Sequence, residues 1–570
     1  MDKQLLTVLD IFCGAGGFSQ GFKQQGFEIV MGIDKWQPAI TTFNYNFNKK
    51  FKIKDILDFE KSLEEIQSLP NTDVIIGSPP CVSFSTSNKS GKADKSTGIR
   101  LIYAFFRIIA VKKYQPNSIL KAWFMENVAN SQKSLPEVVT FRELNLEQFA
   151  LSNNLNPDSI ALRVKSNTTI LNSADFGSYQ ARKRAITGEI IEIGRFVEPN
   201  KTHYEENHSL LNSYNTLGEL LKKMPSPFSQ KDNKVIDPNY GFSIKKSMLT
   251  DHFYDSGIYE CDWNNARFMK TNHPYMGKMS FPERLDTPCR TITATKIANS
   301  REAIILKSEF ERKGNGEYRS LTVREAACIM GFPITFQFTG SENTKWRLFG
   351  NAVCPKVSAA LASTILKYYG KKIPNKPIFE LFGSIKNISN LNSSEIKKFD
   401  IPKQRNKGSR FRRHPFKDGN ITVTLSNYDI LTNSKTISNW QTSIQYGTGE
   451  GFPIQAVPLD FYKKIEVTLK DLENGEAFIH FVNNGFTEKI ASKGILQEMY
   501  EKYESIDNYL EPTKLIEYIS QKIDDFGIDK NIFEQHNMKI FKNKDKVPIK
   551  QLFALYAINK IASVAEGFKL

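Results

Sequence analysis

Cys81 is well placed for nucleophilic chemistry because of the residues on either side of it. The apolar run TDVIIG (72–77) predicts a buried strand, and Pro79 and Pro80 follow it closely. Proline fixes φ and restricts the residue before it, so the backbone would set the direction of the thiol. The polar, lysine-bearing segment at 82–98 then predicts a mobile lid. A packed cysteine beside a turn is the alternative, since single cysteines are commonly buried filler.

One carboxyl and two guanidinium groups could activate an electrophile for this thiol. Glu126 stands near the end of the strand-like run KAWFMENV (121–128). Arg182 and Arg184 alternate in QARKRAI, which places both on the same side of a predicted strand. Arginine donates to carbonyl oxygens, and a protonated carboxyl can bond a ring nitrogen and an exocyclic amine. These groups therefore predict a pocket for a polar heterocycle.

A glycine-rich turn in LDIFCGAGGFSQGF (9–22) predicts a second binding site. The dinucleotide pattern GxGxxG is absent, because Ser19 stands at its last position. Asp10 would be a poor neighbour for a pyrophosphate but a good one for an ammonium group, and Asp34 suits ribose hydroxyls. S-adenosylmethionine fits this pattern better than NAD, with a purely structural turn as the alternative. The glycines that would let a ligand approach the backbone are Gly14, Gly16 and Gly17.

Short apolar runs alternate with amphipathic stretches up to about residue 190, which predicts a parallel sheet covered by helices on both faces. Ligands bind such sheets beyond the carboxyl ends of the strands, where the candidate residues stand. The predicted strands are LLTVLDIF, FEIVMGID, TDVIIGSP and KAWFMENV, and the predicted helices include 101–113, LTVREAACIMGFP and GNAVCPKVSAALASTILKYY.

The bulk composition favours a basic cytoplasmic protein with a polyanionic partner. The 570 residues predict two to four domains, and the formal charge of +16 favours nucleic acid. The six scattered cysteines indicate a reducing compartment and no structural zinc site. We expect no signal peptide and no membrane span, because a strand begins almost at once and no apolar run approaches about 18 residues.

The chain resembles the cytosine-C5 DNA methyltransferases over about residues 5 to 370. The motifs that carry the resemblance occur in the family's order, and they are DIFCGAGGF, GID, KDI, GSPPCVSFS, ENV, QARKR, LTVREAACIMGFP and GNAV. The implied fold class is α/β: a Rossmann-like S-adenosylmethionine-dependent methyltransferase domain, an irregular target-recognition domain, and a separate α+β C-terminal domain.

The resemblance implies a role for each candidate residue. Cys81 would attack C6 of a cytosine flipped out of duplex DNA, and the methyl group of S-adenosylmethionine would go to C5. Glu126 would bind N3 and the exocyclic amine, and Arg184 would bind O2 with support from Arg182. The implied cofactor contacts beyond the glycine loop are Phe12, Asp34, Asp55, Ile56, Pro79, Leu101, Asn351 and Val353.

Two positions depart from the family pattern. Val82 stands where Gln usually follows the catalytic cysteine, and Asp34–Lys35 stands where Glu and an aromatic residue are usual. We expect both to tune activity, because the chemistry depends on Cys81, Glu126 and Arg184.

The resemblance also divides the chain. We expect a catalytic domain at 1–190 completed by 340–370, a target-recognition domain at 191–339, a linker at 371–402 and an accessory domain at 403–570. The basic cluster KQRNKGSRFRRHPFK (403–417) is a candidate contact to the DNA backbone, with a solvated face as the alternative.

The function expected is sequence-specific methylation of double-stranded DNA by a monomer, in a restriction–modification or defence system. A cognate restriction or defence complex is an expected partner. A tRNA cytosine-C5 methyltransferase, a non-catalytic DNA-binding scaffold and a methylase fused to a nuclease are the alternatives. No convincing nuclease motif occurs in the C-terminal segment.

Overall fold

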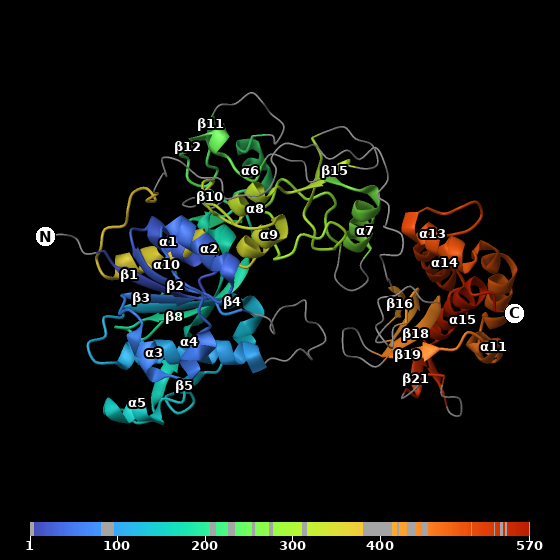
Figure 1. Cartoon of the computed structure of the whole chain (residues 1–570), viewed down its shortest axis with the longest axis horizontal. Helices are drawn as coiled ribbons and strands as arrows, with labels where there is room; N and C mark the ends of the chain where they lie inside the picture. Colours follow the sequence, from blue (N-terminus) through green and yellow to red (C-terminus); the bar gives the residue numbers. More distant parts are fainter. Residues whose placement is uncertain are drawn as a thin grey trace. The chain divides into compact units, whose positions relative to one another are not determined.

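The computed structural model contains two compact units, residues 1–401 and 402–570 (Figure 1). The residues that it describes are 5–80, 96–205, 212–225, 234–252, 257–272, 278–309, 316–379, 413–418, 421–429, 439–446, 454–502, 504–528, 531–535, 540–541 and 544–568. Most of the expected linker and the first ten residues of the basic cluster lie outside these ranges.

A six-stranded sheet forms the centre of the first unit, in the order β2-β1-β3-β4-β8-β7. The strands β2, β1, β3 and β4 are parallel, as the sequence predicts. The strand β8 runs antiparallel to β4, and β7 runs antiparallel to β8. Residues 173–182, which include a 3₁₀ helix, join β7 to β8, a connection shorter than a parallel crossover needs. The bounds are β1 Thr7–Ile11, β2 Glu28–Ile33, β3 Val74–Gly77, β4 Ala122–Val128, β7 Thr168–Asn172 and β8 Lys183–Ile190.

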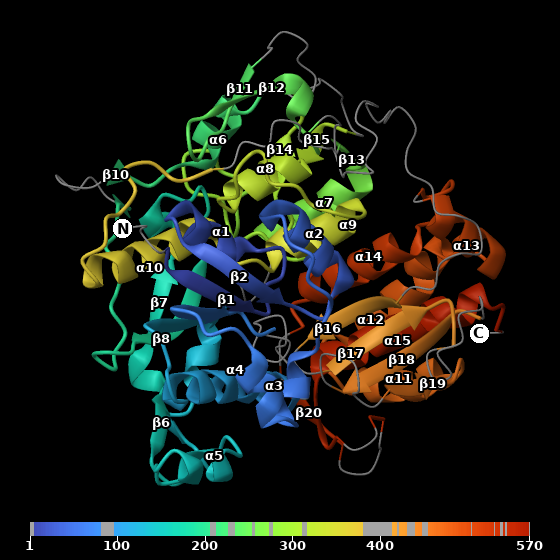
Figure 2. The ribbon, with the colours of Figure 1, turned by 60° about the vertical axis from the view of Figure 1, so that its left-hand side comes forward.

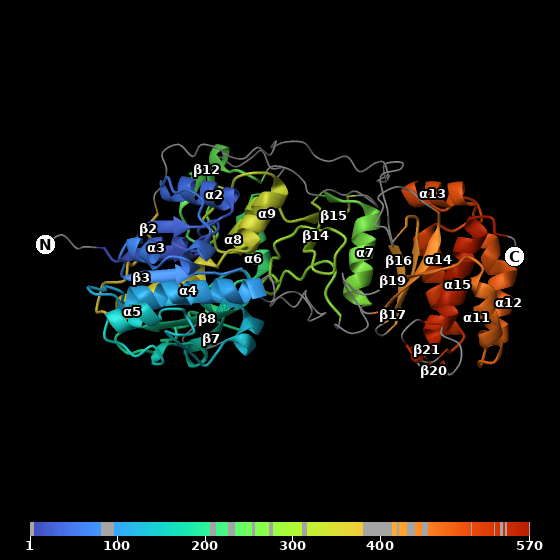
Figure 3. The ribbon, with the colours of Figure 1, turned by 60° about the horizontal axis from the view of Figure 1, so that its bottom comes forward.

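Helices cover both faces of this sheet (Figures 2 and 3). Alternate strand residues divide between two cores, since successive side chains of a strand point to opposite faces. Val8 and Ile76 pack with α1, α2 and α10, whereas Leu9 and Ile75 pack with α3 and α4. The bounds are α1 Gly17–Gln24, α2 Gln37–Phe47, α3 Leu63–Ser68, α4 Ser96–Tyr114 and α10 Pro355–Tyr368.

The helix α10 comes from far along the sequence but packs directly on α1. Gly21 of α1 allows this contact, because a Cβ atom there would lie 2.4 Å from the carbonyl oxygen of Pro355. The segment after GNAV thus completes the fold around the glycine-rich turn. The remaining elements of this lobe are β5 Val138–Thr140, β6 Ile160–Arg163, α5 Glu147–Ser152 and 3₁₀ helices at Ile56–Glu60, Ala129–Ser134, Lys165–Asn167 and Ser173–Phe176.

Residues 191–339 form short strands and helices joined by long loops, as expected from their weak periodicity. A buried ionic cluster lies among them: Nζ of Lys345 is 2.8 Å from Oδ1 of Asp251, and Arg324 donates to the carbonyl oxygens of Thr250 and Phe336. The elements are β9 His203–Tyr204, β10 Asn212–Ser213, α6 Leu217–Lys223, β11 Lys234–Ile236, β12 Ser243–Lys245, a 3₁₀ helix Lys246–Met248, β13 Gly257–Ile258, α7 Glu260–Thr271, β14 Ile305–Lys307, β15 Tyr318–Ser320, α8 Val323–Ile329 and, just beyond them, α9 Glu342–Gly350.

The second unit has its own hydrophobic core between a four-stranded antiparallel sheet and its helices. The helix α15 (Ile549–Ala565) packs on this sheet and is buried over nearly its whole length. A helix that is apolar on all sides requires such complete coverage. The other elements are β16 Arg413–Asp418, β17 Ile421–Ser426, β18 Gln441–Tyr446, β19 Ile454–Val457, α11 Phe461–Lys470, α12 Gly475–Phe481, a π-helical turn Val482–Phe486, a 3₁₀ helix Thr487–Lys489, α13 Lys493–Lys502, α14 Pro512–Asp525, β20 Ile532–Glu534 and β21 Lys546–Pro548.

None of the helices in the described part of the chain is long and apolar enough to cross a membrane. Among the same residues, no group of three or more His, Cys, Asp or Glu side chains could hold a metal ion.

Candidate active site

The ends of three neighbouring strands bring the candidate residues to one edge of the sheet. Gly77, the last residue of β3, pairs with Ile11 of β1 on one side and with Met125 of β4 on the other. Asp10 and Glu126 therefore belong to the same edge, where parallel sheets bind their ligands.

The chain that leads to Cys81 is fastened on both sides. Ser78 donates its N–H to the carbonyl oxygen of Ile11 and its hydroxyl to that of Phe12. Nδ2 of Asn127 donates to the carbonyl oxygen of Pro79 at 3.3 Å. Cys81 and the segment up to residue 95 lie outside the described residues, so the position of the thiol stays a prediction.

Glu126 and Arg184 form an ion pair across the antiparallel β4–β8 pair. Nε of Arg184 lies 3.0 Å from Oε1 of Glu126, and both side chains are largely buried. Burial raises the pKa of Glu126, and the charges of Arg184 and Arg182 offset part of this increase. The carboxyl thus takes up a proton more readily than an exposed glutamate does, and its protonated form could donate a hydrogen bond.

Arg182 has a different environment from Arg184, although we expected both at one pocket. It is buried and donates to three backbone carbonyl oxygens, those of Ile292 at 3.2 Å, Gly350 at 3.1 Å and Ala352 at 3.3 Å. Its guanidinium therefore joins segments that lie far apart in the sequence. We return to this arrangement below.

Asp10 lies at the glycine-rich turn, and one of its two carboxylate oxygens accepts a hydrogen bond. The hydroxyl of Ser19 donates to Oδ2 at 2.6 Å, whereas Oδ1 is buried and has no hydrogen-bond partner among the described residues. Burial raises the pKa of Asp10 to about 7, and the charge of Asp34 adds to this effect. A buried carboxyl with a free oxygen fits a cationic group, because such a group would compensate the lost hydration.

Asp34 closes the turn from the next strand. Its two oxygens accept the N–H groups of Gly14 at 3.0 Å and of Trp36 at 2.8 Å. Its pKa is raised, chiefly by burial. Each oxygen keeps a lone pair for a further donor, such as a ribose hydroxyl.

The three glycines of the turn serve different purposes. Gly14 has a positive φ of 53°, and a Cβ atom there would meet no described atom within 4 Å, so open space borders the backbone. A Cβ at Gly16 would lie 2.3 Å from the ring of Phe47, and one at Gly17 would lie 2.3 Å from the carbonyl oxygen of Val353. Gly14 is thus the glycine that leaves room for a ligand, and the other two allow close packing.

The other predicted cofactor contacts are spread over the same edge. Asp55 caps the following 3₁₀ helix by accepting the N–H of Leu57, and its Oδ2 lies 3.4 Å from Nζ of Lys35. This pair occupies the position where the family pattern departs. Asn351 is exposed at the end of α9, Phe12 has a positive φ of 60°, and the residues that are buried are Phe12, Ile56, Pro79, Leu101 and Val353.

The family model for C-5 cytosine-specific DNA methylases matches residues 6–367. The chain belongs to this family. It is therefore a DNA (cytosine-5-)-methyltransferase, and the predicted fold class and enzyme class are confirmed. The resemblance noted from the motifs covers the same part of the chain.

Several relatives of this methyltransferase are known. The type II methyltransferase M1.HphI of Haemophilus parahaemolyticus is 30% identical over 64% of this chain and 87% of its own length. The type II methyltransferase M.AplI of Arthrospira platensis is 27% identical over 65% of this chain and 88% of its own length. The solved S. pombe Dnmt2 methyltransferase matches with 16% identity and a TM-score of 0.39, over 64% of this chain and 99% of its own.

S-adenosylmethionine is the methyl donor that the family implies, and the residues of the turn fit it. The unpartnered, buried Oδ1 of Asp10 suits its ammonium group, and the open space at Gly14 leaves the backbone accessible. Asp34 retains acceptor capacity for the ribose. The individual contacts remain predictions.

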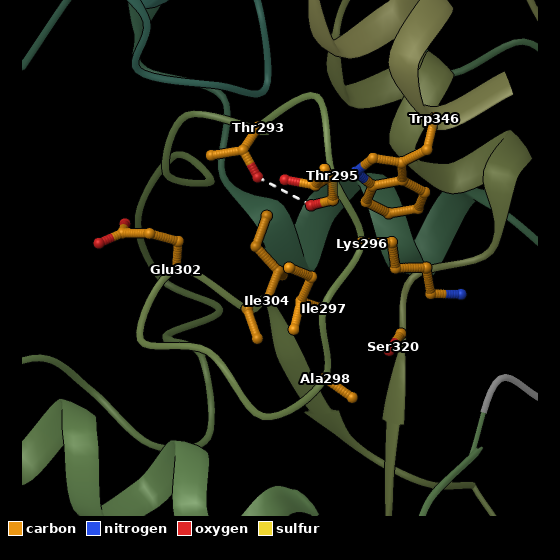
Figure 4. A pocket seen from close by; sticks show the side chains of 10 residues that line it. Thr293, Thr295, Lys296, Ile297, Ala298, Glu302, Ile304, Ser320 and Trp346 are labelled. Atoms are coloured by element: carbon orange, nitrogen blue, oxygen red, sulfur yellow. Dashed lines mark hydrogen bonds between the residues drawn. The ribbon is translucent and has the colours of Figure 1, made fainter. Parts of the chain in front are cut away.

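Sequence reasoning missed two features of this unit. Asn127 holds the segment before Cys81, and its place beside Glu126 in the ENV motif was the available signal. A pocket between the 293–304 loop and α9 contains Trp346, whose Nε1 has no hydrogen-bond partner among the described residues and points toward Thr295 (Figure 4). No local pattern around Trp346 signalled this pocket.

Proposed function

We propose that this enzyme methylates cytosine at C5 within a specific sequence of duplex DNA, in a type II restriction–modification system. The family assignment and the type II methyltransferases among its relatives support the proposal. The net charge of +16 suits a polyanionic substrate. Because C6 of cytosine is inaccessible in a duplex, the target base must leave the stack.

The buried Glu126–Arg184 pair is the observation that carries this proposal. A carboxyl whose pKa is raised by burial can hold the proton that it donates to N3, and it can accept from the exocyclic amine. Arg184 is then close enough to donate to O2 of the same ring. This set of donors matches the Watson–Crick edge of a flipped cytosine.

Cys81 acts on the base held by this pair. Its thiolate adds to C6, which places a negative charge on C5 that the proton on N3 helps to neutralise. Bound S-adenosylmethionine supplies the methyl group that C5 takes. Water takes the C5 proton, the electrons of that C–H bond restore the C5–C6 double bond, and Cys81 leaves with the electrons of its C6 bond, while the proton on N3 has returned to Glu126.

The accessory unit would assist DNA binding. Lys417 of β16 is exposed and belongs to the basic cluster at 403–417, of which residues 403–412 lie outside the described residues. Seven of the fifteen residues in that cluster are Lys or Arg, and none is acidic. Such a density favours contact with phosphates.

Transfer of labelled methyl groups tests the proposal. The wild-type protein, Cys81→Ser and Glu126→Gln are incubated with S-adenosylmethionine and mixed-sequence duplex DNA, and the products are mapped at base resolution. We expect 5-methylcytosine in one short sequence context with the wild type, none with Cys81→Ser, and a rate reduced about 10²- to 10⁴-fold with Glu126→Gln.

Two other substrates separate the alternatives. Incorporation into tRNA but not into DNA would make the protein a tRNA methyltransferase. Mg²⁺-dependent cleavage of unmethylated DNA by the same preparation would add a nuclease activity. Failure with both nucleic acids would contradict the proposal.

A further inference from the structure

Two segments meet in a seam just before β8, and this seam joins the predicted recognition region to the active-site strand. We define the seam as residues 179–182 and 289–292. Ala181 donates its N–H to the carbonyl oxygen of Cys289, and Cys289 donates its N–H to that of Tyr179. The backbone pairing places Cys289, which belongs to the 191–339 region, directly against the chain that becomes β8.

Side chains add three further bonds across the same seam. Oε1 of Gln180 accepts the N–H of Ile292 at 2.6 Å, and the hydroxyl of Thr291 donates to the carbonyl oxygen of Ala181 at 3.2 Å. Nη1 of Arg182 donates to the carbonyl oxygen of Ile292. Gln180 and Arg182 are both buried, so these bonds are shielded from water.

The second terminal nitrogen of Arg182, Nη2, contacts residues 350–353, the segment that packs against the glycine-rich turn. Nη2 donates to the carbonyl oxygens of Gly350 and Ala352, and the next carbonyl, that of Val353, packs against Gly17 of the glycine-rich turn. Gly350 itself lies against the seam's continuation, since a Cβ there would be 2.5 Å from the carbonyl oxygen of Thr293.

The chain that follows residues 289–292 contacts the catalytic lobe again a few residues later. Nζ of Lys296 lies 5.4 Å from the centre of the Trp346 ring, and Figure 4 shows both side chains. The same Nζ forms an ion pair with Glu342 of α9. The stretch from 289 to 296 is therefore attached at both ends to the catalytic lobe. A displacement of the recognition region would therefore strain the hydrogen bonds and the ion pair that form these attachments.

Arg182 stands two residues before Arg184, the partner of Glu126. From this placement we propose that Arg182 is a positioning residue. When the recognition region binds DNA, Arg182 transmits the resulting change in its position to the Glu126–Arg184 pair. The inference builds on the proposed function, because it assigns a residue through which target sequence governs methyl transfer. Its planar fork suits the task, since Nη1 donates to Ile292 while Nη2 donates to Gly350 and Ala352, whereas a lysine ammonium donates from a single point.

The test compares wild type with Arg182→Lys, which keeps the positive charge near Glu126 but loses the fork. The readout is the ratio of kcat/KM on duplex DNA with the mapped target site to kcat/KM on DNA with one base pair of that site changed. We expect the ratio to fall about tenfold in Arg182→Lys, because lost charge-assisted hydrogen bonds uncouple the seam. Thr291→Val, which removes one bond of the same seam, should lower the ratio less.

Arg324→Lys is the matched control. Arg324 is also a buried arginine that donates to backbone carbonyl oxygens, but its partners are Thr250 and Phe336, outside the seam. We expect it to lower the Tm as Arg182→Lys does and to leave the ratio unchanged. An equal loss of activity of Arg182→Lys on both DNAs would overturn the proposal, since it would indicate a direct contact to the cytosine or a merely structural role.

Hydrogen exchange provides a readout that does not need methyl transfer. On addition of duplex DNA, protection should increase together at residues 182–190 and 287–296 in wild type, and only at 287–296 in Arg182→Lys. Joint protection in the variant would refute the coupling. Absence of methyl transfer by wild type would instead refute the proposed function, and the exchange data would still decide the role of Arg182.

Discussion

Replacing Asp10 by Asn should remove a pH dependence from the binding of S-adenosylmethionine. The pKa of Asp10 is raised to about 7, mainly by burial, and its Oδ1 has no partner among the described residues. The carboxylate form would attract the ligand's ammonium group, whereas the protonated form would not. Affinity should therefore increase as the pH rises through 7 in the wild type.

The size of the effect follows from this pKa. With a pKa of about 7, roughly one tenth of the Asp10 side chains are ionised at pH 6 and about nine tenths at pH 8. If binding requires the carboxylate, the Kd falls about tenfold between these pH values, which corresponds to about 1.4 kcal/mol. The side-chain amide of the Asp10→Asn variant does not titrate, so it contributes nothing to this change.

Isothermal titration calorimetry at pH 6, 7 and 8 measures the Kd of both proteins for S-adenosylmethionine. The ligand's own amino group titrates near pH 8, but this contribution is common to both proteins and cancels in the ratio of their Kd values. We expect that ratio to change about tenfold from pH 6 to pH 8. A ratio that stays constant would refute the assignment of Asp10 to the ammonium group.

The unliganded protein provides a check on the sign. A carboxyl whose folded pKa is raised favours folding while it is protonated in both states. Its contribution becomes unfavourable as the pH rises from about 4, the ordinary range of the unfolded group, to about 7. The Tm of wild type relative to Asp10→Asn should therefore decrease over this pH interval. An increase of this Tm difference with pH would contradict the burial of a carboxyl that has no cationic partner.

Three further outcomes follow from the packing. Gly21→Ala places a methyl group 2.4 Å from the carbonyl oxygen of Pro355, and we expect a loss of about 1–3 kcal/mol in the free energy of unfolding, measured by urea denaturation. Lys345→Met removes the 2.8 Å partner of Asp251 but leaves Arg324 3.9 Å away, and the same measurement should show a loss of about 1.5–3 kcal/mol; an unchanged midpoint would contradict the pairing. Residues 402–570 expressed alone should unfold cooperatively on heating, because that unit has its own core; a gradual transition would show that it needs the rest of the chain.

Local patterns in the sequence predicted the parallel part of the sheet. The apolar runs that end at Phe12, Asp34, Pro79 and Val128 correspond to β1, β2, β3 and β4, each within a few residues. The same patterns missed β7, and the strand that they predicted around Arg182 and Arg184 begins only at Lys183, as β8. The antiparallel direction of β8 depends on its pairing with β4, and that of β7 on its pairing with β8, which are tertiary features that periodicity does not encode.

The candidate site, too, was predicted only in part from the sequence. The residue types of Glu126 and Arg184 and their places on predicted strands indicated a shared pocket, and the structure places them in an ion pair. The alternation of Arg182 and Arg184 suggested that both face one pocket, but the carbonyl partners of Arg182 lie more than a hundred residues away in sequence. No pattern near Arg182 could reveal them.

The sequence by itself determined the family, the order of its motifs and the residue types that perform the chemistry, because these depend on local spacing around strand ends. The tertiary structure alone decided which of these residues meet. The carbonyl oxygen of Val353 leaves no room for a side chain at Gly17, and burial within the completed fold raises the pKa of Asp10. Both effects arise from segments that come together only when the chain closes on itself, so neither could be read from the residues beside them.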